Sequence, residues 1–462
     1  MIRRKADTQI RNFLLNSRHA LLVTGARQVG KTFSIRKVGT ECFDVFVEIN
    51  FIENPEAIKL FQESKGAKDL LLRLSAVTSK RLIPGKTLVF FDEVQECKEI
   101  VTAIKFLVDE GSYQYVMSGS LLGIELKDIR SVPVGYLNEI EMYPLDFKEF
   151  LEAIGVSEGV IDHLRECFNN KQSVDPFIHQ RLLEAIKLYL VIGGMPAVVQ
   201  KYLDTNDLGR VLDEQRGIIN TYKRDITKYD PSRKLQIKDI YELIPSELNA
   251  KNKRFILKEL NAKARFQKYE DGFVWLRDAG VAIATYNVEE PTLPLLINKQ
   301  RNLFKLFAND VGLLAAMYGG NIQTTLLENN VCINYGGIYE NFVAQELYAH
   351  GITIEHSLFY FNSKKQGELD FIIEYNNHIL PIEVKSGKDF ERHRALSNIM
   401  NNKSYDIPSA LVFCQDNVYI NGKITYLPIY LTMFLQKEVS TDSKHYTFDL
   451  TGLTSNSKSN SL

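Results

Sequence analysis

Residues 25–32 read GARQVGKT, a full match to the pattern GxxxxGK(S/T), and this segment limits the fold more than any other part of the sequence. The apolar run at residues 20–23 predicts a buried strand that leads into the loop. In such a loop backbone N–H groups turn toward nucleotide phosphates, the lysine contacts the outer phosphates, and the threonine hydroxyl can hold Mg²⁺. A helix that starts near Lys31 would add its dipole. The sequence therefore predicts that a nucleoside triphosphate binds at Gly25, Ala26, Arg27, Gln28, Val29, Gly30, Lys31, Thr32 and Phe33.

A second segment, residues 87–93, reads TLVFFDE and supports the same prediction. The loop pattern alone arises by chance about once in a hundred chains of this size, so an independent match carries weight. The continuous apolar run is typical of a parallel strand buried on both faces, and it ends in two acids. Ligands of open α/β sheets bind at the carboxyl ends of the strands. We therefore expect Thr32 and, through water, Asp92 to hold Mg²⁺, and Glu93 to orient and deprotonate the attacking water.

The composition is that of an ordinary globular protein, with 45% apolar and 24% charged residues. Lys and Arg number 56 against 57 Asp and Glu, so any contact with nucleic acid or a membrane is local. Five scattered cysteines without a CxxC pair argue against a zinc site and a disulfide framework, and indicate a reducing compartment. Since no stretch resembles a signal peptide or reaches the length of a membrane span, we predict a cytoplasmic protein.

Strand and helix patterns alternate up to residue 144, which predicts an α/β fold with a doubly wound parallel sheet as the ATPase core, residues 1–144. Besides the strand before the loop, we expect strands at 45–51, 87–93, 115–117 and 136–142, with helices at 55–74 and 100–109. The remaining segments are a helical lid (145–234), a winged-helix region (235–330), a carboxy-terminal α/β domain (331–440) and a polar tail (441–462) that cannot order itself.

The predicted winged helix contains a strongly basic segment. Apolar runs at 273–276 and 281–286 read as its strands, and residues 251–268 carry seven basic residues against one acid. A basic helix there could follow the phosphates of nucleic acid. The alternative, a solvated face with Phe255, Leu257 and Leu260 packed inward, is favoured about two to one.

A hairpin is predicted near the carboxy-terminal end. Residues 368–375 (ELDFIIEY) and 378–385 (HILPIEVK) read as strands, and they flank an Asn-Asn dipeptide suited to a two-residue loop. In that loop geometry Tyr375 pairs with His378.

Counting outward from this pair places Asp370 opposite Glu383, and the strand period of two puts Lys385 on the same face. Two carboxylates and a lysine so arranged can hold a divalent cation and activate water for phosphodiester hydrolysis. Glu340, near the start of a predicted helix, is a further candidate ligand, although the helix dipole alone favours an acid there. The alternative is a salt-bridged cluster on a solvent-facing sheet, and burial separates the two interpretations.

Several segments together are characteristic: GARQVGKT, LVFFDE, SGS at 118–120, YPLDFKEFL from Tyr143, GGMP from Gly193, YKRDI at 222–226, YENFVAQEL from Tyr339, and ELDF with IEVK. Over nearly its whole length the chain resembles a bacterial and archaeal family of AAA-type ATPases that carry an uncharacterised carboxy-terminal domain. The resemblance implies a STAND-like nucleotide switch, a winged helix and an effector-like end. That end is similar to the PD-(D/E)XK nuclease fold, whose matching positions are Glu340, Asp370, Glu383 and Lys385.

The resemblance also implies groups that contact the γ-phosphate. Ser118 or Ser120 would sense it, and Arg130 lies where AAA-type proteins often place an arginine finger. Arg224 of the YKRDI segment is another candidate, although each arginine is more often a surface ion pair. Where relatives often show Gly-Arg this chain has Gly135-Tyr136, so an arginine role at that place is absent or moved.

Three hypotheses follow. The first is an Mg²⁺-dependent ATPase that moves its lid and winged helix, with adenine implied by the resemblance. The second adds a metal-dependent nuclease in which Asp370, Glu383 and Lys385 are catalytic and Glu340, Asp370 and Glu383 hold the metal. In the third, the nuclease-like domain only binds DNA, RNA or a partner protein. The sequence does not fix the oligomeric state.

Overall fold

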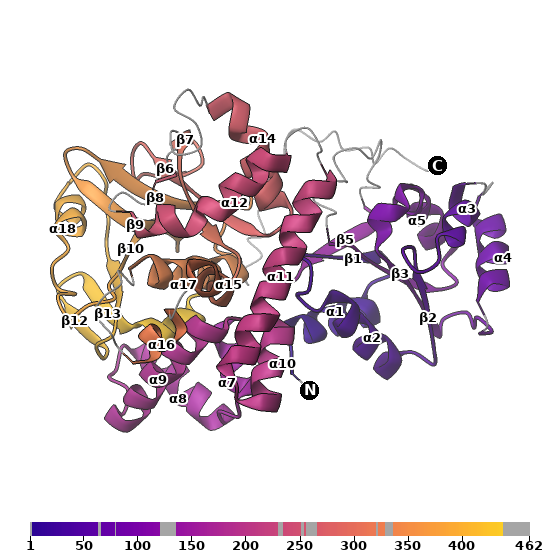
Figure 1. The fold of residues 1–462 in the computed structure, drawn as a ribbon, viewed down its shortest axis with the longest axis horizontal. Helices are drawn as coiled ribbons and strands as arrows, with labels where there is room; N and C mark the ends of the chain where they lie inside the picture. The colour runs from indigo at the N-terminus through magenta and orange to yellow at the C-terminus, as the bar shows by residue number, and fades with distance from the viewer. Residues whose placement is uncertain are drawn as a thin grey trace, which may run out of the picture.

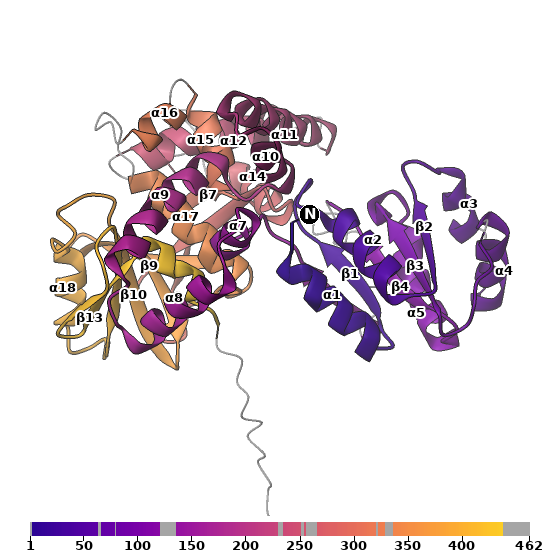
Figure 2. The same cartoon turned by 90° about the horizontal axis from the view of Figure 1, so that it is seen from below.

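The computed structural model describes residues 2–62, 66–78, 80–120, 135–229, 234–250, 254–255, 266–319, 322–328 and 336–437. Figure 1 shows two units side by side: an N-terminal unit built around strands β1–β5, and a larger unit that contains most of the remaining chain. Figure 2 shows the same two units from below. Arg130, and residues 251–253 and 256–265 of the predicted basic helix, lie outside the described residues.

The N-terminal unit contains a five-stranded parallel sheet in the order β2-β3-β4-β1-β5. Every residue of β1 and β3 is buried, and both strands are apolar apart from Thr24, Thr87 and Asp92, as expected of central parallel strands covered on both faces. The α/β core predicted from the alternating pattern is confirmed. Its strands are β1 (Ala20–Thr24), β2 (Val45–Asn50), β3 (Thr87–Asp92), β4 (Gln114–Ser118) and β5 (Leu137–Glu141).

Helices cover both faces of this sheet (Figure 1). The helices α1 (Lys5–Asn16) and α2 (Lys31–Cys42) pack on one face, and α3 (Glu56–Gln62), α4 (Ala67–Val77) and α5 (Lys98–Glu110) pack on the other. The single helix predicted at 55–74 is wrong, since this segment forms α3 and α4. Gly66, with φ +133° and ψ −179°, lies outside the helical region and immediately precedes α4.

The segment predicted as a lid is helical, but it does not form one body above the phosphate loop. Helix α9 (Pro176–Ile192) packs on α15 (Val311–Tyr318) and α17 (Gly336–Ala349) of the larger unit. In contrast, α10 (Pro196–Thr205) and α11 (Leu208–Tyr229) reach the loop or its pocket. Caps fix the starts of two helices: Asp146 forms a capping box with Glu149, and Asp175 accepts hydrogen bonds at the start of α9. The helices are α7 (Phe147–Ala153), α8 (Glu158–Asn170), α9 (Pro176–Ile192), α10 (Pro196–Thr205), α11 (Leu208–Tyr229) and α12 (Lys234–Asn249).

The larger unit contains an eight-stranded mixed sheet in the order β12-β13-β11-β10-β9-β8-β6-β7. The strands are β6 (Ala282–Val288), β7 (Lys299–Ala308), β8 (Leu358–Ser363), β9 (Gly367–Tyr375), β10 (His378–Val384), β11 (Ala410–Cys414), β12 (Tyr419–Asn421) and β13 (Ile424–Pro428). Its helices are α14 (Phe266–Asp278), α15 (Val311–Tyr318), α16 (Ile322–Leu327), α17 (Gly336–Ala349) and α18 (Arg394–Met400), with a 3-10 helix at Ile429–Phe434.

The predicted hairpin has the expected register. Tyr375 pairs with His378, and both loop asparagines have positive φ, as a tight two-residue loop requires.

The structure differs from the predicted winged helix in two elements. Residues 273–276 were expected to be a strand, but they lie inside α14, because a four-residue apolar run fits a buried helix face equally well. The strand expected at 281–286 is present as β6. However, β6 pairs in parallel with β8, so β6 and β7 continue the carboxy-terminal sheet across the boundary predicted at residue 330.

One apolar core runs through both units. It joins Ile10 and Val23 of the N-terminal unit to Leu314 and Phe342 of the larger unit. Within the described ranges, no single helix is long and apolar enough to span a bilayer; α9 and α10 reach that length only as a pair bent by 117°.

Candidate nucleotide-binding site

The phosphate loop connects β1 to α2 and depends on glycine at a defined place. Gly25 has φ +126°, and a Cβ atom there would lie 2.1 Å from the carbonyl oxygen of Met142. Gly30, with φ +96°, forms the N-cap of α2 in a left-handed conformation. Two of the pattern's fixed positions are therefore required by the backbone path itself.

Lys31 is buried under the loop. Its Nζ donates to the carbonyl oxygens of Gly25 at 2.9 Å and Ala26 at 2.8 Å. Burial lowers the pKa of Lys31 to about 8, against the charges of Glu93 and Asp92, which raise it. A phosphate beside this amine would favour its protonated form, because an opposite charge stabilises the ammonium.

The expected magnesium ligands are adjacent. The hydroxyl Oγ1 of Thr32 lies 3.1 Å from Oδ2 of Asp92. Ser118 donates to the other carboxylate oxygen of Asp92, and Asn50 Nδ2 donates to Oδ2 at 3.2 Å. Burial raises the pKa of Asp92, whereas the hydrogen bonds from Ser118 and Thr32 oppose that rise. A hydroxyl and a carboxylate oxygen at this sheet edge are a donor set that suits Mg²⁺ completed by phosphate and water.

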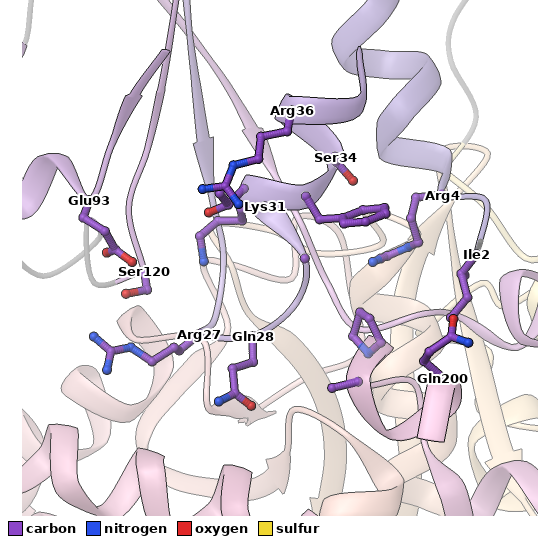
Figure 3. Close-up of a pocket in the computed structure, with 15 residues that line it drawn as sticks. Ile2, Arg4, Arg27, Gln28, Lys31, Ser34, Arg36, Glu93, Ser120 and Gln200 are labelled. Carbon is purple, nitrogen blue, oxygen red and sulfur yellow. The ribbon is translucent and has the colours of Figure 1, made fainter. Parts of the chain in front are cut away.

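Glu93 follows Asp92 and turns out of the strand. Its left-handed backbone, φ 57°, ends β3, and Gln95 Nε2 donates to its carboxylate at 2.6 Å. Figure 3 shows Glu93 and Ser120 on the same side of the pocket as Lys31. The Ser120 Oγ is buried and has no hydrogen-bond partner in the part of the chain that the structure describes.

The structure separates the two serines that the sequence treated together. Ser118 is fully buried behind Asp92 and does not line the pocket, whereas Ser120 does. Arg224 is exposed on α11 and is likewise not among the residues that line the pocket. Six of the predicted loop residues line the pocket: Arg27, Gln28, Gly30, Lys31, Thr32 and Phe33. Gly25 does not line it, and Ala26 and Val29 are buried away from it.

The pocket beside the loop has a volume of about 520 Å³. Figure 3 shows Ile2, Arg4 and Gln200 on the side of the pocket away from Glu93. Phe33, Pro196 and Ala197 also line the pocket. The size lies in the range of small-molecule sites, and the mixture of apolar surface with a few polar groups is typical of them.

The sequence pattern did not predict several residues of this site. Arg4 and Asn50 carried no recognisable pattern, and Gln200 is one polar residue in a helix among many. The segment GGMP gave a partial signal, because Pro196 begins α10 and lines the pocket. Contacts between distant segments carry no short sequence pattern, which is why these residues could not be assigned from the sequence.

The second group of charges lies in a recessed part of the mixed sheet. Glu383 and Glu340 are buried, whereas Asp370 and Lys385 are half-buried. Asp370 accepts a hydrogen bond from the Val384 backbone at 2.8 Å, and Lys385 Nζ donates to Glu383 at 2.7 Å. A solvent-facing sheet, the alternative considered above, does not describe this site.

Lysines pair with the carboxylates of this group. Lys305 of β7 is fully buried and lies 3.5 Å from Glu340 and 2.7 Å from Glu368. Burial lowers the pKa of Lys305, but Glu340, Glu368 and Asp370 outweigh it and raise the pKa overall. Among the described residues, no three His, Cys, Asp or Glu side chains are placed to hold a metal ion. The predicted set of Glu340, Asp370 and Glu383 is therefore not found as a three-ligand group among the described residues; Lys305 pairs with Glu340, and Lys385 pairs with Glu383.

Comparison with protein families gives three matches along the chain. Residues 17–151 match an AAA domain, and residues 183–324 and 335–431 match two domains of unknown function, DUF8612 and DUF4143. An uncharacterized protein of Methanocaldococcus jannaschii is 24% identical over 363 residues, which cover 76% of this chain and 71% of that protein.

Two solved structures match the chain at low similarity. A Walker-type ATPase of Pyrococcus abyssi is 17% identical, with a TM-score of 0.44 over 69% of this chain and 96% of that chain. The ORC1 protein of Aeropyrum pernix, solved in complex with DNA, is 13% identical, with a TM-score of 0.28 over 71% of this chain and 95% of that chain. Residues 17–151 thus match an AAA domain, and they contain a parallel sheet and a phosphate loop of the kind found in P-loop ATPases.

Proposed function

We propose that this protein is an Mg²⁺-dependent ATPase. The proposal rests on the distance of 3.1 Å between Thr32 Oγ1 and Asp92 Oδ2, together with Glu93, which lines the pocket beside the loop. The loop and Lys31 bind the phosphates, and Thr32 and Asp92 hold the cation. When bound, Mg²⁺ supplies neutralisation of the charge that develops on the phosphates. Glu93 orients a water molecule and accepts its proton.

Ser120 is the better candidate for the residue that senses the γ-phosphate. Its buried hydroxyl lines the pocket without a partner among the described residues, whereas the Ser118 hydroxyl is committed to Asp92. A buried polar group without a partner costs free energy that a ligand oxygen would recover.

The base is proposed to be adenine, bound against the apolar wall. Phe33 is 51% exposed at the pocket and offers an aromatic face, and Ile2, Pro196 and Ala197 complete the apolar lining. The Gln200 amide offers both a donor and an acceptor to the edge of the ring.

The test of the proposed chemistry is Glu93→Gln. We expect ATP hydrolysis to slow by about 10²–10⁴-fold, the usual contribution of a general base, while ATP still binds. Lys31→Ala should instead weaken binding itself. Glu96→Gln is the matched control, since this neighbouring glutamate is exposed and does not line the pocket. Hydrolysis by Glu93→Gln at the wild-type rate would remove Glu93 from its role.

A second candidate function is an ATP-gated, metal-dependent nuclease. It is favoured by Glu383, whose Oε2 is buried and has no hydrogen-bond partner among the described residues, next to Asp370 on the paired strand. The test is incubation with plasmid and single-stranded DNA in Mg²⁺ or Mn²⁺, with Asp370→Ala as control. Cleavage that persists in Asp370→Ala would come from a contaminant.

The pairing of lysines with these carboxylates favours a third hypothesis, in which the carboxy-terminal domain binds DNA, RNA or a protein without cleaving nucleic acid. Binding of DNA that weakens steeply with salt, without cleavage, would support it. Stimulation of ATP turnover by DNA would join the two units in one mechanism.

A further inference from the structure

The outer side of the phosphate loop is held by residues that do not belong to the loop. The Tyr222 hydroxyl, on α11, donates to the carbonyl oxygen of Arg27 at 3.0 Å. Arg4, just before α1, donates through Nη1 to the carbonyl oxygen of Val29 at 2.9 Å. Two alternate carbonyl groups of the loop are thus fixed from outside.

Holding these carbonyls also sets the direction of two N–H groups. A peptide group is planar and trans, so its C=O and its N–H point in opposite directions. The carbonyl of Arg27 shares a peptide plane with the N–H of Gln28, and that of Val29 shares one with the N–H of Gly30. Because Tyr222 and Arg4 hold these two oxygens, the N–H groups of Gln28 and Gly30 are turned away from Tyr222 and Arg4 and are free to point at a bound phosphate.

Both anchors are themselves firmly held. Tyr222 is 1% exposed, and its hydroxyl accepts a hydrogen bond from Asn309 Nδ2 at 3.4 Å. Arg4 also donates to the Tyr143 carbonyl at 2.7 Å and to Glu149 at 3.1 Å.

A charge pair ties α11 to the loop a second time. Arg27 Nη1 donates to Asp225 Oδ1 at 3.0 Å, one helical turn beyond Tyr222. The segment YKRDI therefore contacts the loop through its tyrosine and its aspartate, whereas its arginine, Arg224, is exposed.

We propose that Tyr222, Asp225 and Arg4 are positioning residues that preorganise the phosphate loop for the β- and γ-phosphates. This inference rests on the nucleotide binding proposed above. The same contacts would couple α11 to the loop. When the loop adjusts to a bound phosphate, the carbonyl group that Tyr222 contacts moves, and this movement would shift the position of α11.

The chain offers a matched pair of variants to test this. Tyr222→Phe removes one buried hydroxyl that donates to a backbone carbonyl and accepts from a side-chain amide. Tyr189→Phe removes a hydroxyl with the same pattern, since Tyr189 donates to the Leu145 carbonyl and accepts from Gln345 Nε2 at 2.8 Å. Tyr189 does not contact the loop, so the pair separates loop positioning from the general loss of a buried hydrogen bond.

The measurements are the Kd for Mg·ADP by titration calorimetry, and KM and kcat for ATP. We expect Tyr222→Phe to raise Kd and KM about 3- to 10-fold, the range for one lost hydrogen bond, with kcat nearly unchanged. Phosphate positioning contributes to ground state and transition state alike, which is why KM changes and kcat does not. Tyr189→Phe should lower thermal stability to a similar extent but leave Kd and KM at the wild-type values.

The outcomes are distinct. Wild-type protein that does not bind Mg·ADP would refute the proposed function itself. Binding by wild type together with equal Kd and KM in Tyr222→Phe and Tyr189→Phe would overturn the positioning role. If Tyr222→Phe does not fold, Asp225→Asn replaces it, and an unchanged Kd in that variant overturns the proposal equally.

Discussion

Contacts with neighbouring residues determine which residue types can stand at single positions of the nucleotide-binding site. Gly25 is needed because the Met142 carbonyl occupies the place of a side chain, and Asp92 is aimed by Ser118, Asn50 and Thr32. A pattern of allowed residue types records these requirements without revealing the neighbours that impose them.

Gly25→Ala should therefore be strongly destabilising. The positive φ costs a side chain about 1–2 kcal/mol, and the new Cβ would in addition collide with the Met142 backbone at 2.1 Å. Gly85→Ala is the control, because Gly85 has φ +73° but open space around it. Urea unfolding should show a clearly larger loss for Gly25→Ala, and equal losses would mean that the backbone adjusts to remove the clash.

Glu383 should make stability depend on pH. Burial raises its pKa to about 8, the charge of Asp370 adds to the rise, and Lys385 opposes it. In the unfolded chain the pKa of a glutamate is about 4.3, so at a pH between the two pKa values the folded protein holds a proton that the unfolded chain has lost. This contribution is fully present below the unfolded pKa and is lost as pH rises through the folded pKa.

Melting temperatures from pH 5 to 9 test this. Wild type should lose stability relative to Glu383→Gln as pH rises, with the exposed Glu290→Gln as control. Parallel curves for wild type and Glu383→Gln would contradict the raised pKa.

Among the elements, helix α17 is notable because its segment YENFVAQEL is buried although several of its residues are polar. Its polar side chains satisfy backbone groups of other elements: Asn341 bonds both backbone groups of Ala308, Gln345 accepts from Val311, and Glu346 accepts from Phe147. The sequence of this helix shows no apolar stripe, because other parts of the protein bury nearly its whole circumference.

The junction of α7 with α17 and α1 should be sensitive to charge. Asp146 caps α7, contacts Lys5, and lies 3.4 Å from His350 at the end of α17. Asp146→Asn keeps the cap but removes the carboxylate beside Lys5, which is partly exposed, and beside His350, which still faces Glu346 at 3.8 Å. We expect the loss of these charged hydrogen bonds to cost about 1.5–3 kcal/mol. Asp175→Asn at the exposed cap of α9 is the control and should be nearly neutral, because asparagine caps as well as aspartate. A neutral Asp146→Asn in urea unfolding would show that this junction does not depend on the charge.

At the level of the whole molecule, the AAA domain and the larger unit share one apolar core. Sheet order alone would suggest independent bodies, yet buried residues of α1, α2 and β1 pack in the same cluster as those of α15 and α17. The phosphate loop lies at this junction, within reach of α11 and of Gly280.

Scanning calorimetry should therefore give a single unfolding transition. The Glu93→Gln variant should bind Mg·ATP without turnover. The bound nucleotide should then raise the temperature of the whole transition, by an amount set by the ratio of ligand concentration to Kd. Two transitions of which ATP moves one would contradict the shared core.

The sequence by itself determined the parallel core, the loop, the acidic end of β3 and the register of the β9–β10 hairpin, because each depends on local pattern: apolar runs, fixed glycines and a two-residue turn. It could not separate a strand from a helix at 273–276, where four apolar residues satisfy both periods. The tertiary structure decided which serine faces the pocket, that Tyr222 and Arg4 hold the loop, and that β6 and β7 join the carboxy-terminal sheet. These features depend on contacts between residues about 25 to 200 positions apart, and such contacts are selected by packing of the whole chain rather than by neighbouring residues.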